Sequence, residues 1–160
     1  MSHLKEIEMR VVSSSASKGK AILFSDTDST LQTLSNLQKL ILQNLNLGQL
    51  PVVIQNCENL EILNVEDNNI VHFPGYMPNI SNLILNGNRR IDLDQILSCL
   101  NPSTLQFLNI GSCNLSQLPS RIADFQKKEN IYFGRTCLQK IPVELVFLER
   151  MYVTCKYIVK

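Results

Sequence analysis

One pattern of leucine and proline recurs five times between residues 37 and 138, and it constrains the fold more than any other feature of this chain. The clearest copies are LQKLILQNLNLGQLP at 37–51, LEILNVEDNNIVHFP at 60–74 and LQFLNIGSCNLSQLP at 105–119. The copies start at residues 37, 60, 80, 105 and 128, so the periods are 23, 20, 25 and 23 residues. A fixed period of this length indicates a solenoid, in which each repeat buries its apolar face only against its neighbours.

Within each copy, apolar residues alternate with variable ones from the third to the seventh position, which predicts a short strand with its leucines on one face. Stacked copies would pair these strands into a parallel sheet. The inward residues are Leu40/Leu42, Leu63/Val65, Leu83/Leu85, Leu108/Ile110 and Ile131/Phe133. At the ninth position we expect a short polar side chain to bond into the neighbouring turn, where backbone groups need partners. The residues that suit this turn ladder are Asn68, Asn88, Cys113 and Thr136. Leu45 does not, which suits a terminal repeat with no preceding neighbour.

The third copy and the two ends depart from this pattern. The run 91–100 predicts a helix, with Asp92 as its N-cap, Gln95 three residues later and Ile96, Leu97 and Leu100 on its inner face. The N-terminal segment 6–12 alternates as a half-buried strand, and with the run 21–24 it predicts a hairpin over the first repeat. We therefore expect a cap over residues 1–36 and five to six repeats over 37–160, with a last strand near 151–159, in one domain.

The composition of the chain indicates in which cellular compartment the protein is expected. The segment 1–12 has no apolar core of a secretory signal, and no apolar run approaches the length needed to cross a bilayer. Five cysteines, an odd number without paired terminal clusters, favour reduced thiols in the cytoplasm or nucleus. The net charge is +1, but residues 121–160 carry 8 basic and 4 acidic side chains. This basic end is interpreted as a solvated face, with nucleic-acid binding as an alternative.

The pattern LxxLxLxxNxLxxLPxxI resembles the typical intracellular class of leucine-rich repeat proteins over residues 37–142. The resemblance implies an α/β solenoid: a short right-handed arc with parallel strands along its concave side, where partners are held. That class includes signalling scaffolds and some receptor subunits of cullin–RING ubiquitin ligases. The segment Met151-x-x-x-Cys155-x-x-x-Val159 is the nearest match to the recruiting box of such receptors, and it is degenerate.

The functional hypothesis rests on the variable residues that lie between the leucines of each copy. Side chains at the third and fifth positions point away from the core, and we call the surface that they form the concave face. One residue of each pair is apolar and the other polar or charged, so an apolar zigzag crosses every strand with a polar edge. The zigzag is Ile41, Ile62, Ile84, Phe107 and Tyr132, and its edge holds Asn64, Asn82, Asn109 and Asn130. The charged residues that could orient a partner are Glu61, Glu66 and Asp67 at one end and Arg135 at the other. The alternative is that these side chains only shield one another.

No sequence motif suggests catalysis, a metal or a cofactor. CxxC, HxxxH and phosphate-loop patterns are absent, and His72 is interpreted as a surface residue. We therefore predict a non-catalytic scaffold or adaptor that binds a protein on the concave face, takes no small-molecule substrate and does not insert into a membrane. The alternatives are a recognition or regulatory subunit of a larger enzyme, such as a ubiquitin ligase or phosphatase, and a nucleic-acid-binding protein.

Overall fold

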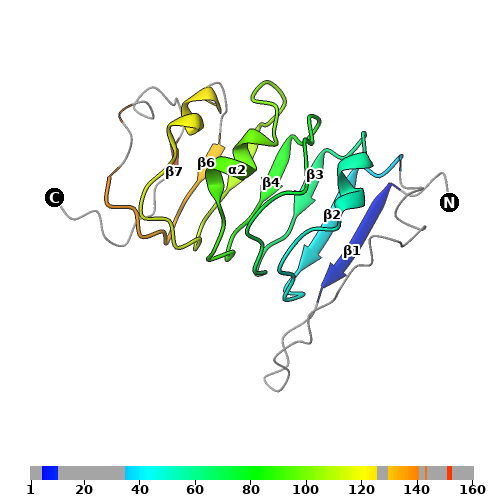
Figure 1. Ribbon diagram of the computed structural model, residues 1–160, viewed down its shortest axis with the longest axis horizontal. Helices are drawn as coiled ribbons and strands as arrows, with labels where there is room; N and C mark the ends of the chain where they lie inside the picture. Colours follow the sequence, from blue (N-terminus) through cyan, green and yellow to red (C-terminus); the bar gives the residue numbers. More distant parts are fainter. Residues whose placement is uncertain (1–4, 11–34, 126–129, 141–142, 144–150, 153–160) are drawn as a thin grey trace, which may run out of the picture.

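In the part of the chain that the structure describes, seven strands form a single parallel sheet whose order is the order of the sequence. The computed structural model describes residues 5–10, 35–125, 130–140, 143 and 151–152. Figure 1 shows the strands side by side along the long axis of the molecule. The strands are β1 (Glu6–Arg10), β2 (Lys39–Gln43), β3 (Ile62–Asn64), β4 (Asn82–Ile84), β5 (Phe107–Asn109), β6 (Asn130–Tyr132) and β7 (Met151–Tyr152).

The register of the sheet follows the sequence repeat. Leu40 lies opposite Leu63, Leu63 opposite Leu83, and Leu83 opposite Leu108. Because equivalent residues face each other on successive strands, the inward leucines stack into continuous rows. These rows and the apolar residues of the turns form one core, in which Leu63, Leu83 and Leu85 have no exposed surface. The predicted inward residues of the five copies are all buried.

Short helical segments close the side of the core that faces away from the strands. They are η1 (Val52–Asn56), α2 (Leu93–Ser98) and η2 (Ser120–Phe125), and they lie along the same side of the molecule in Figure 1. Their buried side chains, among them Ile54, Ile96 and Phe125, belong to the same core as the inward leucines. The helical segments therefore cover the inner face of the sheet and leave its outer face uncovered by them.

The predicted helix of the third copy is confirmed. Asp92 is the N-cap of α2 and accepts a hydrogen bond from the backbone N–H of Gln95 at 3.1 Å. Ile96, Leu97 and Leu100 are buried, as the inner-face assignment requires. The third copy lacks the Leu-Pro step, and a short α-helix takes the place of the 3₁₀ turn that follows Pro51 and Pro119.

The N-terminal strand adds to the sheet in parallel. β1 pairs with β2, and Glu6 lies opposite Lys39. The second strand of the predicted hairpin, at residues 21–24, lies outside the described part of the chain. The first copy therefore does have a preceding strand as its neighbour, contrary to the expectation for a terminal repeat. At the other end β7 pairs with β6 as a further strand, and residues 153–159 of the predicted last strand are not described.

Candidate functional site: the concave face

The outward side chains form two rows across the strands, because the register aligns third positions with third positions and fifth with fifth. The third-position row is Lys39, Ile62, Asn82, Phe107 and Asn130, and the fifth-position row is Ile41, Asn64, Ile84, Asn109 and Tyr132. β1, which was predicted as part of a cap, extends the rows with Glu6 and Glu8. From β2 to β6, apolar and polar residues alternate along each row.

Exposure along this face is uneven. Ile62, Ile84, Phe107 and Tyr132 are half-buried and offer apolar surface to the solvent. Ile41 is different: it is only 6% exposed, so it adds little contact surface to the predicted zigzag. In the register of the sheet, Ile41 lies between Glu8 of β1 and Asn64 of β3. The exposed apolar surface therefore lies on β3 to β6.

Two of the edge asparagines stabilise the ends of their strands. The Oδ1 atom of Asn64 accepts a hydrogen bond from the backbone N–H of Glu66 at 3.0 Å, and Asn109 does the same with Gly111 at 3.0 Å. Each side chain thus satisfies a backbone group two residues ahead, where the strand turns away. Asn64 is only 7% exposed and so is mainly structural. Asn82 is half-buried on β4, and for Asn130 the structure describes only the place of its backbone in the register.

A side-chain ladder at the seventh position was missed by the sequence analysis. The carboxylate of Glu66 accepts one hydrogen bond from Nε2 of Gln43 at 3.0 Å and another from Nδ2 of Asn86 at 2.8 Å. These three residues occupy the same position in consecutive copies, at the carboxyl ends of their strands: Gln43 is the last residue of β2, and Glu66 and Asn86 lie two residues after β3 and β4. The ladder holds Glu66 in place at the carboxyl ends of the strands, and amide residues on both sides of an acidic one are the signal that could have revealed it.

Glycine replaces this ladder in the next two copies. Gly111 and Gly134 are the seventh-position residues after β5 and β6, and both are buried. A Cβ atom on Gly111 would lie 3.0 Å from Oδ1 of Asn86 and 3.1 Å from the ring atom Cε1 of Tyr132. The amide of Asn86 and the ring of Tyr132 therefore meet over Gly111, which permits this close approach.

The remaining charged candidates lie at the borders of the face. Glu61 is exposed just before β3, and Asp67 and Arg135 are exposed at the eighth position of their copies. Asp67 packs against the backbone of the next copy, since a Cβ atom on Gly87 would collide with its Oδ1 atom. The eighth position has a left-handed backbone in all five copies, with φ between 53° and 80°. Its residues are Asn44, Asp67, Gly87, Ser112 and Arg135.

The turn ladder at the ninth position is extensive in the middle copies. The Oδ1 atom of Asn68 accepts hydrogen bonds from the backbone N–H groups of Leu45 and Leu47, and its Nδ2 donates to the carbonyl of Leu42 at 2.7 Å. Asn88 likewise bonds to Ile70 and Val65 of the preceding copy. The thiol of Cys113 donates to the Leu85 carbonyl at 3.2 Å, whereas Thr136 donates to Phe133 in its own turn at 2.9 Å. These side chains connect backbone groups and lie away from the concave face.

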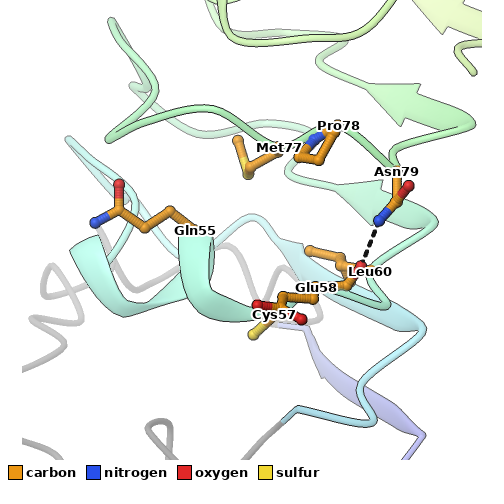
Figure 2. A pocket seen from close by; sticks show the side chains of 7 residues that line it. All are labelled: Gln55, Cys57, Glu58, Leu60, Met77, Pro78 and Asn79. Carbon is orange, nitrogen blue, oxygen red and sulfur yellow. Dashed lines mark hydrogen bonds between the residues drawn. The ribbon is translucent and has the colours of Figure 1, made fainter. Parts of the chain in front are cut away.

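A pocket of about 330 Å³ lies outside this face, between the end of the first copy, which includes η1, and the end of the second. Figure 2 shows Gln55 and Cys57 on one side of it and Met77, Pro78 and Asn79 on the other. The amide of Asn79 donates a hydrogen bond to the backbone carbonyl of Glu58 at 2.6 Å and so connects the second copy to the first. Burial raises the pKa of the Cys57 thiol, which disfavours the reactive thiolate.

The described residues contain no group of histidine, cysteine or acidic side chains that could hold a metal ion. His72 lies on the convex side, with Nδ1 at 3.9 Å from a carboxylate oxygen of Asp92, and both side chains are largely exposed. Of the basic C-terminal residues, Arg135 and Lys140 are exposed, and Lys127, Lys128, Arg150, Lys156 and Lys160 lie outside the described part. Over the described residues, no helix is long and apolar enough to cross a membrane.

Comparison with known proteins supports the fold. No protein-family model and no curated protein sequence matches this chain. Among solved structures, it is similar to a leucine-rich repeat protein of Leptospira interrogans, with 22% identity and a TM-score of 0.55 over 78% of this chain and 39% of that one. It also matches a plant peptide hormone receptor, RGFR1 in complex with RGF2, with 20% identity and a TM-score of 0.48 over 95% of this chain and 26% of the receptor. This chain thus covers about two fifths of the Leptospira chain and a quarter of the receptor.

The repeat spacing, the parallel register and the Leptospira structure agree: this chain has a leucine-rich repeat fold, an α/β solenoid with its strands along one side.

Proposed function

We propose that this chain is a non-catalytic interaction module that binds a partner protein on its concave face and acts as a scaffold or adaptor in intracellular signalling. The observation that carries this proposal is the half-buried apolar side chains of Ile62, Ile84, Phe107 and Tyr132 on four adjacent strands. Apolar surface that is continuous, partly exposed and edged by polar groups is characteristic of a protein interface.

The energetics favour the aromatic residues as anchors. A partner that fully covered one of these side chains would gain on the order of 1–3 kcal/mol before the costs of association. Phe107 and Tyr132 lie on neighbouring strands, β5 and β6, so that one partner segment can cover both. Aromatic side chains dominate the binding energy of many interfaces. We therefore expect the affinity of this module to depend mainly on these two residues.

The same proposal places the protein in the cytoplasm or nucleus. The four cysteines of the described residues, Cys57, Cys99, Cys113 and Cys137, are all free thiols. Free thiols are typical of a reducing compartment. A fluorescent fusion expressed in the cells of origin tests this placement, and accumulation in the secretory pathway would contradict it.

Partner capture tests the proposed interface. The variant Phe107→Glu/Tyr132→Glu puts two charges on the concave face. Its matched control, Val52→Glu/Tyr76→Glu, puts the same charges on two apolar residues of the opposite side, which are 46% and 56% exposed. Proteins captured from extracts of the source cells by the wild type should be retained by the control variant and lost with the concave variant. Thermal unfolding of all three proteins verifies that each is folded. If the control variant loses the partners and the concave variant keeps them, the interface lies on the other side.

A further inference from the structure

We propose that the concave face binds an extended polypeptide segment with one basic residue over Glu66 and apolar side chains two and four residues away from it. The apolar side chains contact Ile84, Phe107 and Tyr132. This inference rests on the proposed function and adds the chemistry of the partner. It follows from the way in which the face changes from a carboxylate at β3 to apolar surface at β6.

Glu66 is a positioned anion. It is half-buried, and the amides of Gln43 and Asn86 hold its two carboxylate oxygens at 3.0 and 2.8 Å. Amide groups donate hydrogen bonds but carry no charge, so they leave the negative charge of Glu66 uncompensated. Among the described residues, the ion pairs of the structure join Lys39 to Glu6, His72 to Asp92 and Arg121 to Asp94, and none includes Glu66. A side chain that is already fixed loses little conformational entropy when a cation binds it.

The charged residues that flank β3 have the same sign as Glu66. Glu61 and Asp67 flank the same strand and are exposed. Lys39, a cation at the third position of the same face, forms an ion pair with Glu6 at 2.6 Å. Arg10 of β1 stands opposite Gln43, two strands away from Glu66. The β3 end of the concave face therefore complements a lysine or arginine, and it disfavours an acidic residue there.

The opposite end of the face suits an apolar side chain. Gly111 and Gly134 present no side chain at the seventh position, in contrast to Gln43, Glu66 and Asn86 of the earlier copies. The ring of Tyr132 lies over Gly111, and Phe107 is half-buried beside it. Covering this surface removes apolar area from water and needs no charged partner.

The spacing of the strands fixes the pattern of the segment. Neighbouring strands are about 4.8 Å apart, so the three steps from β3 to β6 span about 14 Å. An extended chain rises about 3.3 Å per residue, so four residues span about 13 Å. Side chains of an extended segment alternate between faces, and residues separated by two and four therefore point to the same side. Glu66 stands at the seventh position of its copy and Ile84 and Tyr132 at the fifth, so the segment crosses the strands obliquely. A basic residue over Glu66 then places the second residue towards Ile84 and the fourth towards Tyr132, whose diagonal neighbour on β5 is Phe107.

Asn86 makes this surface continuous. Its Nδ2 binds Glu66, and its Oδ1 lies close to Gly111, next to the ring of Tyr132. No charged side chain of the described residues stands on β4 or β5 between the carboxylate and the aromatic ring. A segment that crosses the strands can therefore contact both ends at once.

Selection from a display library of random 12-residue peptides tests this inference. Wild-type protein should enrich peptides that contain one lysine or arginine and apolar residues two and four positions away from it. The variant Glu66→Gln should lose the preference for the basic residue. Glu58→Gln is the matched control, since Glu58 is an exposed glutamate that lines the pocket outside the concave face. It should enrich the same peptides as the wild type.

A double-mutant cycle distinguishes a direct contact between Glu66 and the basic residue of the peptide from an indirect effect of Glu66 on the fold. For a selected peptide, Glu66→Gln should weaken binding about two- to five-fold, as for an exposed ion pair, and should have no effect once the basic residue of the peptide is serine. Equal losses for both peptides would mean that Glu66 acts only through the fold, and the inference would fail. Enriched peptides without a basic residue, or no enrichment, would also overturn it. The partner-capture experiment is independent of these outcomes and judges the proposed function separately.

Discussion

Arg135 has a left-handed backbone conformation, with φ at 57°, that arginine rarely adopts. The same conformation occurs at the eighth position of every copy, where the other residues are two of the types that tolerate it best, asparagine and glycine, together with aspartate and serine. Because this turn sends the chain from the strand into the body of the repeat, the conformation is set by the repeat and not by the residue. Arg135 therefore holds strain that glycine would relieve.

We predict that Arg135→Gly raises the free energy of unfolding by about 1 kcal/mol. The matched control is Arg89→Gly, because Arg89 is also exposed in a turn but is not among the residues with positive φ. There, glycine should lower stability by about 0.5–1 kcal/mol. Urea unfolding of both variants measures the difference. If the two substitutions change stability in the same direction, the strain at Arg135 is negligible.

Asn68 connects more backbone groups than its size suggests. Its side chain bonds to Leu42, Leu45 and Leu47 in the preceding copy and to Val65 in its own. We predict that Asn68→Ala lowers the free energy of unfolding by about 2–4 kcal/mol, since several buried backbone groups lose their partners. The neighbouring Asn69→Ala, at an exposed site, should cost less than about 1 kcal/mol. Equal losses in a denaturant titration would contradict the role of the turn ladder.

Among the elements, α2 depends on a single side chain for its start. Asp92 accepts the hydrogen bond of Gln95, and the helix has only six residues, from Leu93 to Ser98. We predict that Asp92→Ala lowers stability by about 1 kcal/mol, whereas Asp92→Asn, which keeps the capping oxygen, changes it by only a few tenths. Thermal unfolding of both variants measures this. If Asp92→Asn is as destabilising as Asp92→Ala, the charge near His72 matters more than the cap.

The strands and α2 follow from local rules, and the sequence therefore predicted them. Leucine alternation defines which residues face inward, and Asp92 with Gln95 defines where α2 begins. The low exposure of Ile41 is not evident from its own copy, since Ile84 at the equivalent position is half-buried, and the neighbour of Ile41 on β1 comes from 33 residues earlier. The Gln43–Glu66–Asn86 ladder joins three copies and likewise requires the register in space. Local periodicity thus predicted the elements, while contacts between copies determined the details of the concave face.

At the scale of the whole molecule, one core runs through all the described copies from Leu37 to Leu138. Each copy contacts its neighbours along the sheet, so the stability of the arc is approximately the sum of the intrinsic stabilities of the copies and of the interfaces between them. Cys113 belongs to such an interface: it has no exposed surface, and its thiol bonds to Leu85 of the preceding copy. Burial raises the pKa of this thiol from 9.0 to about 11. The ionisation of one central side chain is therefore coupled to the folding of the arc.

This coupling predicts a loss of stability at high pH. Below about pH 9 the thiol is protonated in both the folded and the unfolded chain, but between about pH 9 and 11 only the unfolded chain releases the proton. Ionisation therefore favours unfolding, and the contribution from Cys113 falls by about 2 kcal/mol over this range. Cys113→Ala lacks the group and is less stable than wild type at neutral pH, since the Leu85 carbonyl loses its donor. The stability difference between the two proteins should shrink as the pH rises, while all other titrating groups cancel. Urea titrations at several pH values measure it, and a constant difference would show that the Cys113 thiol ionises equally in the folded and unfolded chains.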